Sequence, residues 1–572
     1  MIIYIYINNN GGNTTTMKNK FKELRYISLI LIVCLILCIP LLSSDLDVYY
    51  DDGIQHIARA YSTNLSIKNH EHTTVLSNLA NGFGYSWDLF YGPLSSIMII
   101  LGKLITTTFI SGYKLVLFIG LLLSGITMYA FVYKLTNNKL TSTIASIFYI
   151  IMPYHLTDMY IRNAVGEFLS YIFIPLVFLG LYNLFHKEKR DWLLCLGAVG
   201  LLLTHNLMTF LTAIMAFIYL CTNFSKLKDT KILKKLFFNV VCILCISAFF
   251  WMPMVETALS GEYQVYQENA MSTADSFAES ALDLEALFFT QKDATHVFEM
   301  GIPIIIILCL SIFTIKKVTG LHYKKEYILF LCLGILCLIM TTKYFPWNLC
   351  GNYFKMIQFP WRMLVFANFF LAIICALNIQ ILIKNFNIKD VIFFSFVCVL
   401  CTVPLINFLP TDQELVDMDQ WSIGILTENT SDVIAGMGKS EYLPVKFNKH
   451  RSYILNKNGV SVLSGKGDIN EQKKDGQSLT CNVEIFEDHT ILEFPYTYYP
   501  GYHIFLNGME VDGFQSSNGL LAISVNKMEL STVMVQYTGT FVMHLSRIIS
   551  VISVLGFMFY IFVCHFRNKF IL

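Results

Sequence analysis

AVGEFLSYIFIPLVFLGLYNLF, residues 164–185, is an apolar run with a single charged side chain, Glu167. A stretch of this length is enough to cross the roughly 30 Å hydrocarbon core of a bilayer as an α-helix. Comparable runs recur along the chain, which is 55% hydrophobic and 14% charged and has a mean hydropathy of +0.56. This composition excludes an ordinary soluble protein and indicates a polytopic α-helical membrane protein.

The apolar runs predict about 12 membrane spans. With that number, the Lys and Arg clusters between the runs all face the cytoplasm, and both termini are cytoplasmic. Residues 93–110 would break this parity if they crossed, so we expect a juxtamembrane or re-entrant helix there. The predicted spans are residues 26–43, 112–133, 140–152, 164–185, 191–204, 207–222, 236–253, 300–315, 326–341, 360–383, 390–408 and 541–563.

The domain organisation follows from these spans. We expect a cytoplasmic N-terminus over residues 1–25, of which 1–16 precede a more natural start at Met17. A multispan membrane domain then covers 26–408, with a first outer loop at 44–111, and residues 541–572 form the last span and a cytoplasmic tail. Between them, residues 409–540 are strand-like and contain the hairpin signal Asn507-Gly508, which predicts an extracytoplasmic β-sandwich. Its expected strands are 490–494, 502–506, 509–511, 521–525 and 532–537.

Charge and cysteine usage exclude some functions. The formal net charge is +1, and the basic residues lie in short clusters between apolar runs, so nothing supports a nucleic-acid partner. Most of the fifteen cysteines lie inside apolar segments, where they are best interpreted as small core residues. Only Cys350 and Cys481 fall in predicted extracytoplasmic regions, where a disulfide could join them.

The first outer loop contains the polar stretch DDGIQHIAR, residues 51–59. A helix opening at Asp51 or Asp52 would place Asp52, His56 and Arg59 on one face, at steps of four and three residues. The simpler interpretation is an interfacial helix capped by the aspartates, whose His and Arg face water. The functional one is a catalytic carboxylate beside an imidazole and a guanidinium.

Further polar residues are predicted at the outer face. The turn 152–163 holds His155, Asp158 and Arg162, and Glu167 follows one turn into the next span, where a carboxylate is costly unless it is paired or faces a wet cavity. Glu167 and Arg162 could form a buried ion pair that locks two helices, or both could line a polar pocket.

His205 and Arg362 also fall at this face. His205 is followed by Asn206 between two apolar runs, where some polar hairpin turn is needed in any case. Arg362 follows Trp361 at the outer end of a span, where it could hold a lipid phosphate or simply extend to the headgroups. The sequence contains no soluble-enzyme signature such as a phosphate-binding Gly-rich loop, a nucleophile elbow or His-Glu-x-x-His.

Several motifs in their order resemble the bacterial membrane proteins called YfhO-like and the related family named after 6-pyruvoyl-tetrahydropterin synthase. The resemblance covers nearly the whole chain from about Met17. Its motifs are Tyr50-Asp51-Asp52 with His56 and Arg59, NGFGY at 81–85, LFYGPL at 89–94, PYHLTDMYIR at 153–162, GEF at 166–168, THN at 204–206, QFPWR at 358–362 and YYPGY at 498–502 with Asn507-Gly508.

The resemblance implies a GT-C-type glycosyltransferase, a multispan enzyme that takes sugar from a polyprenyl-phosphate carrier at the outer face. The catalytic carboxylate is then Asp51 or Asp52 of the first outer loop. Asp52 would act as base, with Arg59, Arg162 or Arg362 near the leaving phosphate. The pterin-synthase name implies no pterin chemistry, because no zinc-ligand pattern of that enzyme is visible. The candidate substrate-binding residues are His56, Arg59, His155, Asp158, Arg162, Glu167, His205 and Arg362.

The sequence leaves the binding partners and two alternative functions open. The expected partners are a polyprenyl-phosphate-linked sugar, a cell-surface glycan, polymer or lipid acceptor, and the membrane lipid. A divalent metal ion could be held by Asp51, Asp52, Asp158 and Glu167, or be absent. Two other functions are a transporter or flippase for a lipid-linked glycan and an assembly factor whose β-domain binds a wall polymer. The sequence shows no internal repeat, and its ionisable residues cluster at one face, which favours an enzyme.

Overall fold

The computed structural model describes residues 17–44, 46–268, 270, 272–290, 296–402, 408–410, 424–428 and 436–566. The prediction that residues 1–16 precede the true start lies outside the described residues. The same holds for most of the predicted boundary near residue 411 and for the basic tail from residue 567.

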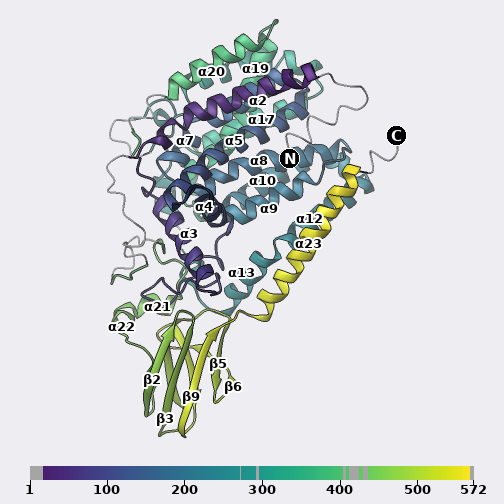
Figure 1. The fold of residues 1–572 in the computed structure, drawn as a ribbon. Helices are drawn as coiled ribbons and strands as arrows, with labels where there is room; N and C mark the ends of the chain where they lie inside the picture. The colour runs from purple at the N-terminus through teal and green to yellow at the C-terminus, as the bar shows by residue number, and fades with distance from the viewer. Residues whose placement is uncertain are drawn as a thin grey trace.

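Each predicted span coincides with one helix or a broken pair of helices, packed side by side in the upper part of Figure 1. The helices are α2 (Met17–Leu37), α5 (Phe109–Thr136), α6 (Lys139–Ile151), α8 (Val165–Phe185), α9 (Leu193–Thr204), α10 (Asn206–Thr222), α12 (Thr230–Ile246) with α13 (Ala248–Ser260), α15 (Ile302–Cys309) with α16 (Ser311–Thr314), α17 (Lys324–Met340), η6 (Pro360–Met363) with α19 (Leu364–Leu382), α20 (Ile388–Thr402) and α23 (Phe541–Phe566).

The number of complete crossings is smaller than the predicted number. Among the described residues, four helices are long and apolar enough to cross a membrane: 109–136, 165–185, 360–382 and 541–563. The pair α12 and α13, bent by 69°, would make a fifth. Many of the other predicted spans are shorter apolar helices, and the span expected at 300–315 is interrupted at Leu310. The count of about 12 is therefore not confirmed, because several apolar runs end within a few turns instead of extending across a bilayer.

The centre of the helical bundle is α8. In α8, 94% of the most apolar stretch is buried inside the protein, whereas in α23 only 11% of the corresponding stretch is buried. Close packing of α8 on α9 depends on glycine, since a Cβ at Gly180 would stand 2.1 Å from the backbone nitrogen of Leu194. The hydrophobic core is thus inside the bundle, and α23 lies at its edge.

The segment predicted as the first outer loop contains two helices, α3 (Gly53–Lys68) and α4 (Leu94–Thr106). α4 has 13 residues, which is too short to cross a bilayer by itself, so a juxtamembrane or re-entrant position stays a prediction. The other short helices are α7 (Pro153–Tyr160), α11 (Phe224–Leu227), α14 (Ala274–Glu279), α18 (Trp347–Phe354), α21 (Val445–Lys449) and α22 (Arg451–Leu455), and the 3-10 turns are η1 (Ile39–Leu42), η2 (Gln264–Tyr266), η3 (Leu284–Leu287), η4 (Lys317–Gly320) and η5 (Lys355–Ile357).

The C-terminal region forms two antiparallel sheets, ordered β1-β4-β8-β7 and β2-β3-β9-β5-β6. Their inner faces share one apolar cluster, in which Leu479 and Val533 of one sheet accompany Leu492 and Ile523 of the other. The hairpin at Asn507-Gly508 joins two of the strands, as expected. The strands are β1 (Ser461–Ser464), β2 (Gly467–Asp475), β3 (Ser478–Ile485), β4 (Thr490–Thr497), β5 (Tyr502–Leu506), β6 (Met509–Val511), β7 (Phe514–Gln515), β8 (Leu520–Val525) and β9 (Met528–Tyr537).

Cys481 points into this cluster and is a free thiol. Cys350 is also free, so the disulfide considered between them is not formed. Burial raises the pKa of the Cys481 thiol to about 11, as suits a small core residue.

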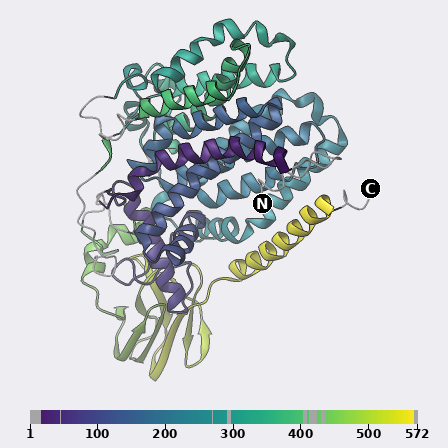
Figure 2. The ribbon, with the colours of Figure 1, turned by 45° about the horizontal axis from the view of Figure 1, so that its top comes forward.

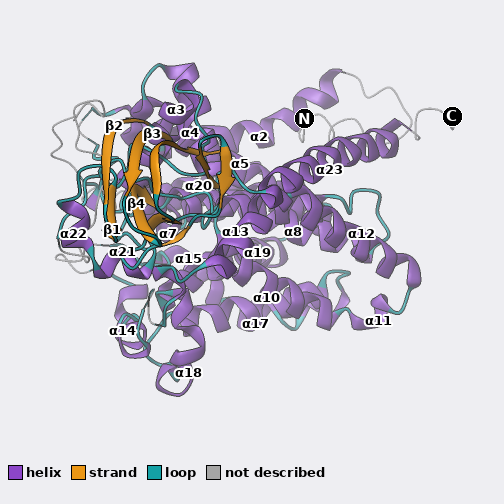
Figure 3. Cartoon of the chain, turned by 90° about the horizontal axis from the view of Figure 1, so that it is seen from below, coloured by secondary structure: helices purple, strands orange, loops and turns teal. Residues whose placement is uncertain are grey.

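The sandwich docks on the segment between α2 and α5, below the helical bundle in Figures 1 and 2. Seen from below in Figure 3, the strands cover the region of α3, α4 and α7. Hydrogen bonds fix the contact: the Thr497 amide donates to the carbonyl of Phe83 at 2.8 Å, and the Trp87 indole donates to the carbonyl of Gly436 at 2.5 Å. The first loop and the C-terminal region therefore hold one another in place.

Candidate active site

Asp52 is positioned by a tight turn at the start of α3. It is the N-cap residue of that helix, although its side chain makes no capping hydrogen bond. Asp51 before it has a left-handed φ of 52°, and a Cβ at Gly53 after it would stand 2.0 Å from the carbonyl oxygen of Val48, so only glycine fits. The Asp52 amide donates to the carbonyl of Arg162 at 3.1 Å. This bond ties the aspartate turn to the segment between α7 and α8.

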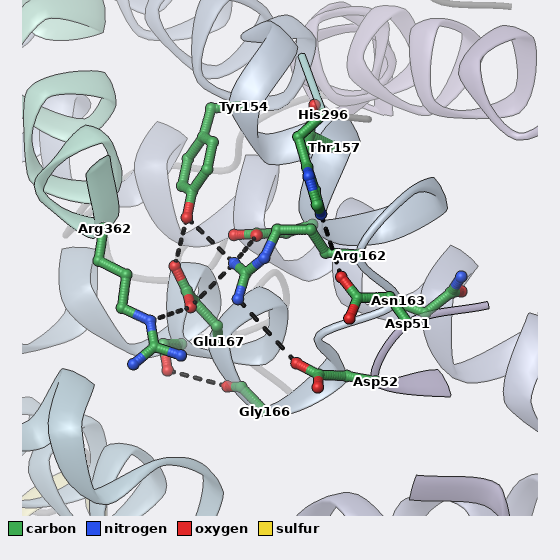
Figure 4. Close-up of polar contacts among 12 residues, drawn as sticks. Asp51, Asp52, Tyr154, Thr157, Arg162, Asn163, Gly166, Glu167, His296 and Arg362 are labelled. Atoms are coloured by element: carbon green, nitrogen blue, oxygen red, sulfur yellow. Dashed lines mark hydrogen bonds and ion pairs between the residues drawn. The ribbon is translucent and has the colours of Figure 1, made fainter. Parts of the chain in front are cut away.

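Arg162 is the centre of a buried polar network (Figure 4). Its guanidinium lies 2.5 Å from Asp158 of α7 and 3.1 Å from Glu167 in the first turn of α8. Tyr154 joins the network, donating to Glu167 at 2.8 Å and accepting from Arg162 at 3.1 Å. Both carboxylate side chains are fully buried, so the expected ion pair between Glu167 and Arg162 exists and is part of a larger cluster.

A second guanidinium reaches the same carboxylate from η6. Nε of Arg362 lies 3.2 Å from Oε2 of Glu167, and Arg362 also donates to the carbonyl of Ile357 at 3.1 Å and to the Gln358 side chain. The neighbouring Trp361 ring packs under Arg162, whose guanidinium carbon is 4.6 Å from the ring centroid. Glu167 is thus shared by two arginines from distant parts of the chain.

Asp52 lies at the edge of this network. Its carboxylate is 4.0 Å from Nη2 of Arg162. Its side chain is 46% exposed, whereas the side chains of Asp158 and Glu167 are fully buried. Desolvation by the surrounding protein raises the pKa of Asp52, while the charge of Arg162 opposes the rise and that of Asp51 adds to it. Asp52 is therefore the carboxylate of this cluster that an incoming molecule can reach.

Asp51 points to a different partner. Its carboxylate lies 3.1 Å from Nε2 of His296, in the segment that precedes α15. The Asp51 side chain is 38% exposed. The two adjacent aspartates therefore have separate environments, one facing Arg162 and the other facing a histidine.

Two predicted binding residues, Arg59 and His155, lie in closed surroundings. Arg59 is 0% exposed and is held by Asp88 at 2.6 Å and by the carbonyls of Tyr91 and Gly92 at 3.0 and 3.1 Å. His155 is stacked on Tyr171 with ring centroids 3.7 Å apart. Asp52, His56 and Arg59 therefore do not line one accessible site, as was predicted from their spacing, because the Arg59 side chain is buried inside the protein.

His56 and His205 both lie near the Tyr91 ring, with ring-centroid distances of 6.1 and 5.6 Å. Burial, followed by the charge of Arg59 and then His205, lowers the pKa of His56 to about 3, so His56 is neutral at neutral pH. Nδ1 of His205 accepts the Met208 amide at 3.2 Å and caps α10. Gly166, next to Glu167, packs closely against Tyr91, since a Cβ there would stand 2.1 Å from the Tyr91 hydroxyl.

The four carboxylates considered for a divalent metal do not suit one. Asp158 and Glu167 direct their oxygens at guanidinium groups, and Asp51 faces His296. Within the described ranges, no group of three or more His, Cys, Asp or Glu side chains has the arrangement of a metal site. A cation would have to compete with two arginines for these ligands, so these carboxylates do not fit a divalent metal ion.

The structure adds residues that were not predicted from the sequence. Tyr154 and Trp361 belong to motifs already noted, Pro153-Tyr154 and Pro360-Trp361, but their roles as donor and ring platform need three-dimensional contacts. His296 follows no recognisable pattern in the loop before α15. The fourth residue that was not predicted is Glu441, which lies in the C-terminal region.

Glu441 is brought to the first turn of α3 by the segment before α21. The Gly438 amide donates to the side-chain oxygen of Gln55 at 2.9 Å, and a Cβ at Gly438 would stand 2.9 Å from Oε2 of Glu441. Burial raises the pKa of Glu441 to about 7, the backbone N–H groups of Glu441 and Lys439 lower it, and the charge of Asp52 raises it. The C-terminal region thus contributes a carboxyl group next to the Asp52 turn.

We expect Glu441→Gln to raise stability at alkaline pH. The free energy of unfolding contributed by wild-type Glu441 is complete below its unfolded pKa of 4.5 and is lost as pH rises through about 7, because only the unfolded chain ionises in between. The difference between these two pKa values corresponds to roughly 3 kcal/mol in the free energy of unfolding. Thermal unfolding should show a higher midpoint for the variant at alkaline pH and equal midpoints at acidic pH. Glu484→Gln, at an exposed position of β3, serves as control, and a gain equal to that control would contradict the prediction.

Residues 89–410 match the family described as 6-pyruvoyl-tetrahydropterin synthase related domain; membrane protein. An uncharacterized protein of Lactococcus lactis subsp. cremoris (strain MG1363) is 26% identical over 317 residues, which are 52% of this chain and 50% of the relative. The chain therefore matches about half the length of that curated relative.

Two solved structures are similar to parts of this chain. Arabinofuranosyltransferase AftD from Mycobacteria is 13% identical with a TM-score of 0.44, covering 68% of this chain and 27% of AftD. The archaeal oligosaccharyltransferase AglB from Archaeoglobus fulgidus, solved with an inhibitory peptide and a dolichol-phosphate, is 12% identical with a TM-score of 0.32, covering 70% of this chain and 57% of AglB. Both TM-scores are below 0.5.

Proposed function

Because the chain belongs to the 6-pyruvoyl-tetrahydropterin synthase related family of membrane proteins, we propose that it is a membrane glycosyltransferase that uses a polyprenyl-phosphate-linked sugar. The acceptor in this proposal is a cell-surface glycan, polymer or lipid at the extracytoplasmic face. The observation that carries it is Asp52, a half-exposed carboxylate of the first outer loop, 4.0 Å from a guanidinium of a buried charged network.

The residues have distinct roles in the proposed reaction. Asp52 takes the proton of an acceptor hydroxyl, whose oxygen then forms a bond to the anomeric carbon of the sugar. The bond between that carbon and the phosphate oxygen breaks, and the electron pair leaves with the polyprenyl phosphate. Arg362 faces this developing charge, since its Nη2 group has no protein acceptor among the described residues.

The buried network has a positioning role in this scheme. Arg162 and Arg362 balance Asp158 and Glu167, so the cluster is close to neutral without Asp52. The network fixes Arg162 with three hydrogen bonds, and Arg162 fixes the Asp52 turn through its carbonyl oxygen. A rigid base close to a guanidinium is the arrangement that proton abstraction and charge stabilisation require.

The direct test is release of polyprenyl phosphate by the full-length chain in lipid vesicles. The donors are polyprenyl-phosphate hexoses with a radiolabelled sugar, and the acceptor is an unfractionated bacterial cell-envelope preparation. The proposal expects label to move into the envelope material in step with release of polyprenyl phosphate. A flippase would instead move the intact labelled lipid across the bilayer, and that outcome would overturn the proposal.

The pH dependence of transfer gives a further prediction. Because the pKa of Asp52 is raised, kcat/KM should fall as pH decreases through a midpoint above the ordinary 3.8 of an aspartate. The base is active only when ionised, so the loss is on the acidic side. Rates measured from about pH 4 to about pH 8 locate this midpoint. A flat profile down to the ordinary aspartate value would show that Asp52 is not the base.

A further inference from the structure

A cleft of about 600 Å³ lies between two pairs of helices, away from the Asp52 turn. One wall is formed by α3 and α4, and the other by the beginnings of α13 and α23, close to the β-sandwich. A volume of this size is typical of sites for small molecules and lipids. The lining residues used below are His72, Thr74, Ile97, Leu101, Phe250 and Arg547.

The cleft has an apolar side that is continuous with the lipid-facing surface. Ile97 and Leu101 of α4 line it and are exposed, as are Leu104 and Ile105 further along the same helix. Phe250 of α13 lies on the opposite wall. In a membrane protein, an apolar opening of this kind admits hydrocarbon chains from the bilayer.

The other side of the cleft is polar and has an uncompensated cation. Arg547 of α23 donates to Thr74 at 3.4 Å and forms no ion pair within 4.0 Å in the described part of the chain. His72 is beside it, and burial, followed by the charges of Arg547 and His544, lowers the pKa of His72. Arg547 is therefore the charged group and His72 a neutral hydrogen-bonding group.

Two acidic residues also line the cleft, but each is already engaged. Asp88 forms the 2.6 Å ion pair with Arg59, and Glu71 accepts the Ser77 hydroxyl at 2.5 Å. Oε1 of Glu71 is directed at Gly476 of the β2–β3 turn, since a Cβ there would stand 1.7 Å from it. On the α3–α4 wall, the buried hydroxyls of Thr63 and Ser96 have no hydrogen-bond partner among the described residues.

We propose that this cleft binds a membrane lipid whose phosphate-bearing headgroup has a net negative charge, unlike zwitterionic phosphatidylcholine, with the phosphate at Arg547, His72 and Thr74 and the hydrocarbon along Ile97, Leu101 and Phe250. A guanidinium pairs with phosphate through two parallel hydrogen bonds, and an apolar wall open to the bilayer accommodates the chain. The lipid bridges α3–α4 and α13–α23 and so joins the first outer loop to the last membrane helix.

This lipid is separate from a sugar donor reacting at Asp52. The cleft begins on α3 at Thr63, eleven residues after Asp52, which corresponds to about 16 Å of helix. That distance is too long for a phosphate whose attached sugar must react beside Asp52. The inference therefore goes beyond the proposed transfer reaction and does not depend on it.

The test uses the full chain, purified in detergent and returned to nanodiscs of phosphatidylcholine. Phosphatidylglycerol, a polyprenyl monophosphate and inorganic phosphate are added separately, and bound lipid is measured by native mass spectrometry together with the shift in thermal unfolding. The wild type should retain one of the two lipid phosphates and be stabilised by it. Arg547→Gln should weaken that binding about tenfold, whereas Arg547→Lys should keep part of it.

Two further variants separate the headgroup from the chain. Ile97→Trp fills the apolar side and should reduce lipid binding while leaving Arg547 in place. Lys343→Gln removes an exposed cation that pairs with Asp283 elsewhere on the surface, and it should leave lipid binding unchanged. The proposal is overturned if inorganic phosphate stabilises the protein as well as the lipids do, if Arg547→Gln binds like the wild type, or if neither lipid is retained.

Discussion

Asp52→Asn is expected to reduce sugar transfer by about 10²- to 10⁴-fold, the usual contribution of a positioned general base. The amide has nearly the same shape as the carboxylate but cannot accept the acceptor proton at neutral pH. Transfer is measured as radiolabel moved from the polyprenyl-phosphate donor to the cell-envelope acceptor. Binding of the donor should change little, because the loss is in the chemical step.

This substitution should leave the fold intact, which makes the result interpretable. The Asp52 side chain makes no capping hydrogen bond, is 46% exposed, and is 4.0 Å from its nearest charged partner. A contact of this kind is worth about 0–1 kcal/mol, small compared with the stability of a packed bundle. A large loss of transfer without a shift in thermal unfolding therefore assigns a chemical role to Asp52.

Asp51→Asn is the matched control, because it makes the same change one residue earlier. Asp51 faces His296 at 3.1 Å (Figure 4), whereas the ion pair of Asp52 is with Arg162. We expect Asp51→Asn to keep most of the transfer activity. Equal losses in both variants would mean that the turn as a whole matters, and normal transfer by Asp52→Asn would rule out the proposed base.

The sequence predicted the local elements well where a one-dimensional pattern carries the information. Strand β5 and its hairpin partner β6 have the expected bounds, because alternating apolar residues and the Asn507-Gly508 turn specify both. Strands β1, β3 and β7 were not predicted, and neither was β2, whose sequence GDINEQKKD is almost entirely polar. Strand β2 is an exposed edge strand, paired only with β3, so no buried face marks it in the sequence.

Helix positions were also predictable, but their number of complete crossings was not. Hydropathy marks apolar runs, and it does not distinguish a helix that faces lipid from a short one covered by neighbours. α6 illustrates this: its 13 residues read as a span, yet most are buried against other helices. The run 93–110 was predicted not to cross the membrane only because charge parity required it, and this stays a prediction.

The sequence predicted which residues belong to the candidate site better than it predicted which contacts they make. Arg162, Glu167 and Arg362 were expected at one face, and they meet in one network. Arg59 was placed on the face of Asp52 by helix periodicity, but its pairing with Asp88 depends on the path of a loop that periodicity does not describe. Glu441 could not be found at all, because it reaches α3 from almost four hundred residues away along the chain.

The largest expected effect on stability comes from Arg162→Gln. The variant leaves Asp158 and Glu167 buried with one guanidinium fewer between them, and breaking a buried pair in this way costs about 3–5 kcal/mol. Glu167 still has Arg362, so the charge on Asp158 accounts for most of the cost. Thermal and denaturant unfolding of the full chain in nanodiscs measure the loss, and transfer should fall with it because the Asp52 turn is bonded to the Arg162 backbone.

A second substitution distinguishes the loss of charge balance from a simple loss of packing. Asp158→Asn in the Arg162→Gln background removes the carboxylate that has lost its partner, while the shape of the side chain is kept. If electrostatics dominate, the double variant should regain 1 kcal/mol or more, on the order of measured couplings between contacting charges. If cavity formation dominates, the double variant should be no more stable than Arg162→Gln. Recovery of stability without recovery of transfer would further show that the network balances its own charge and, separately, holds Asp52 in a reactive position.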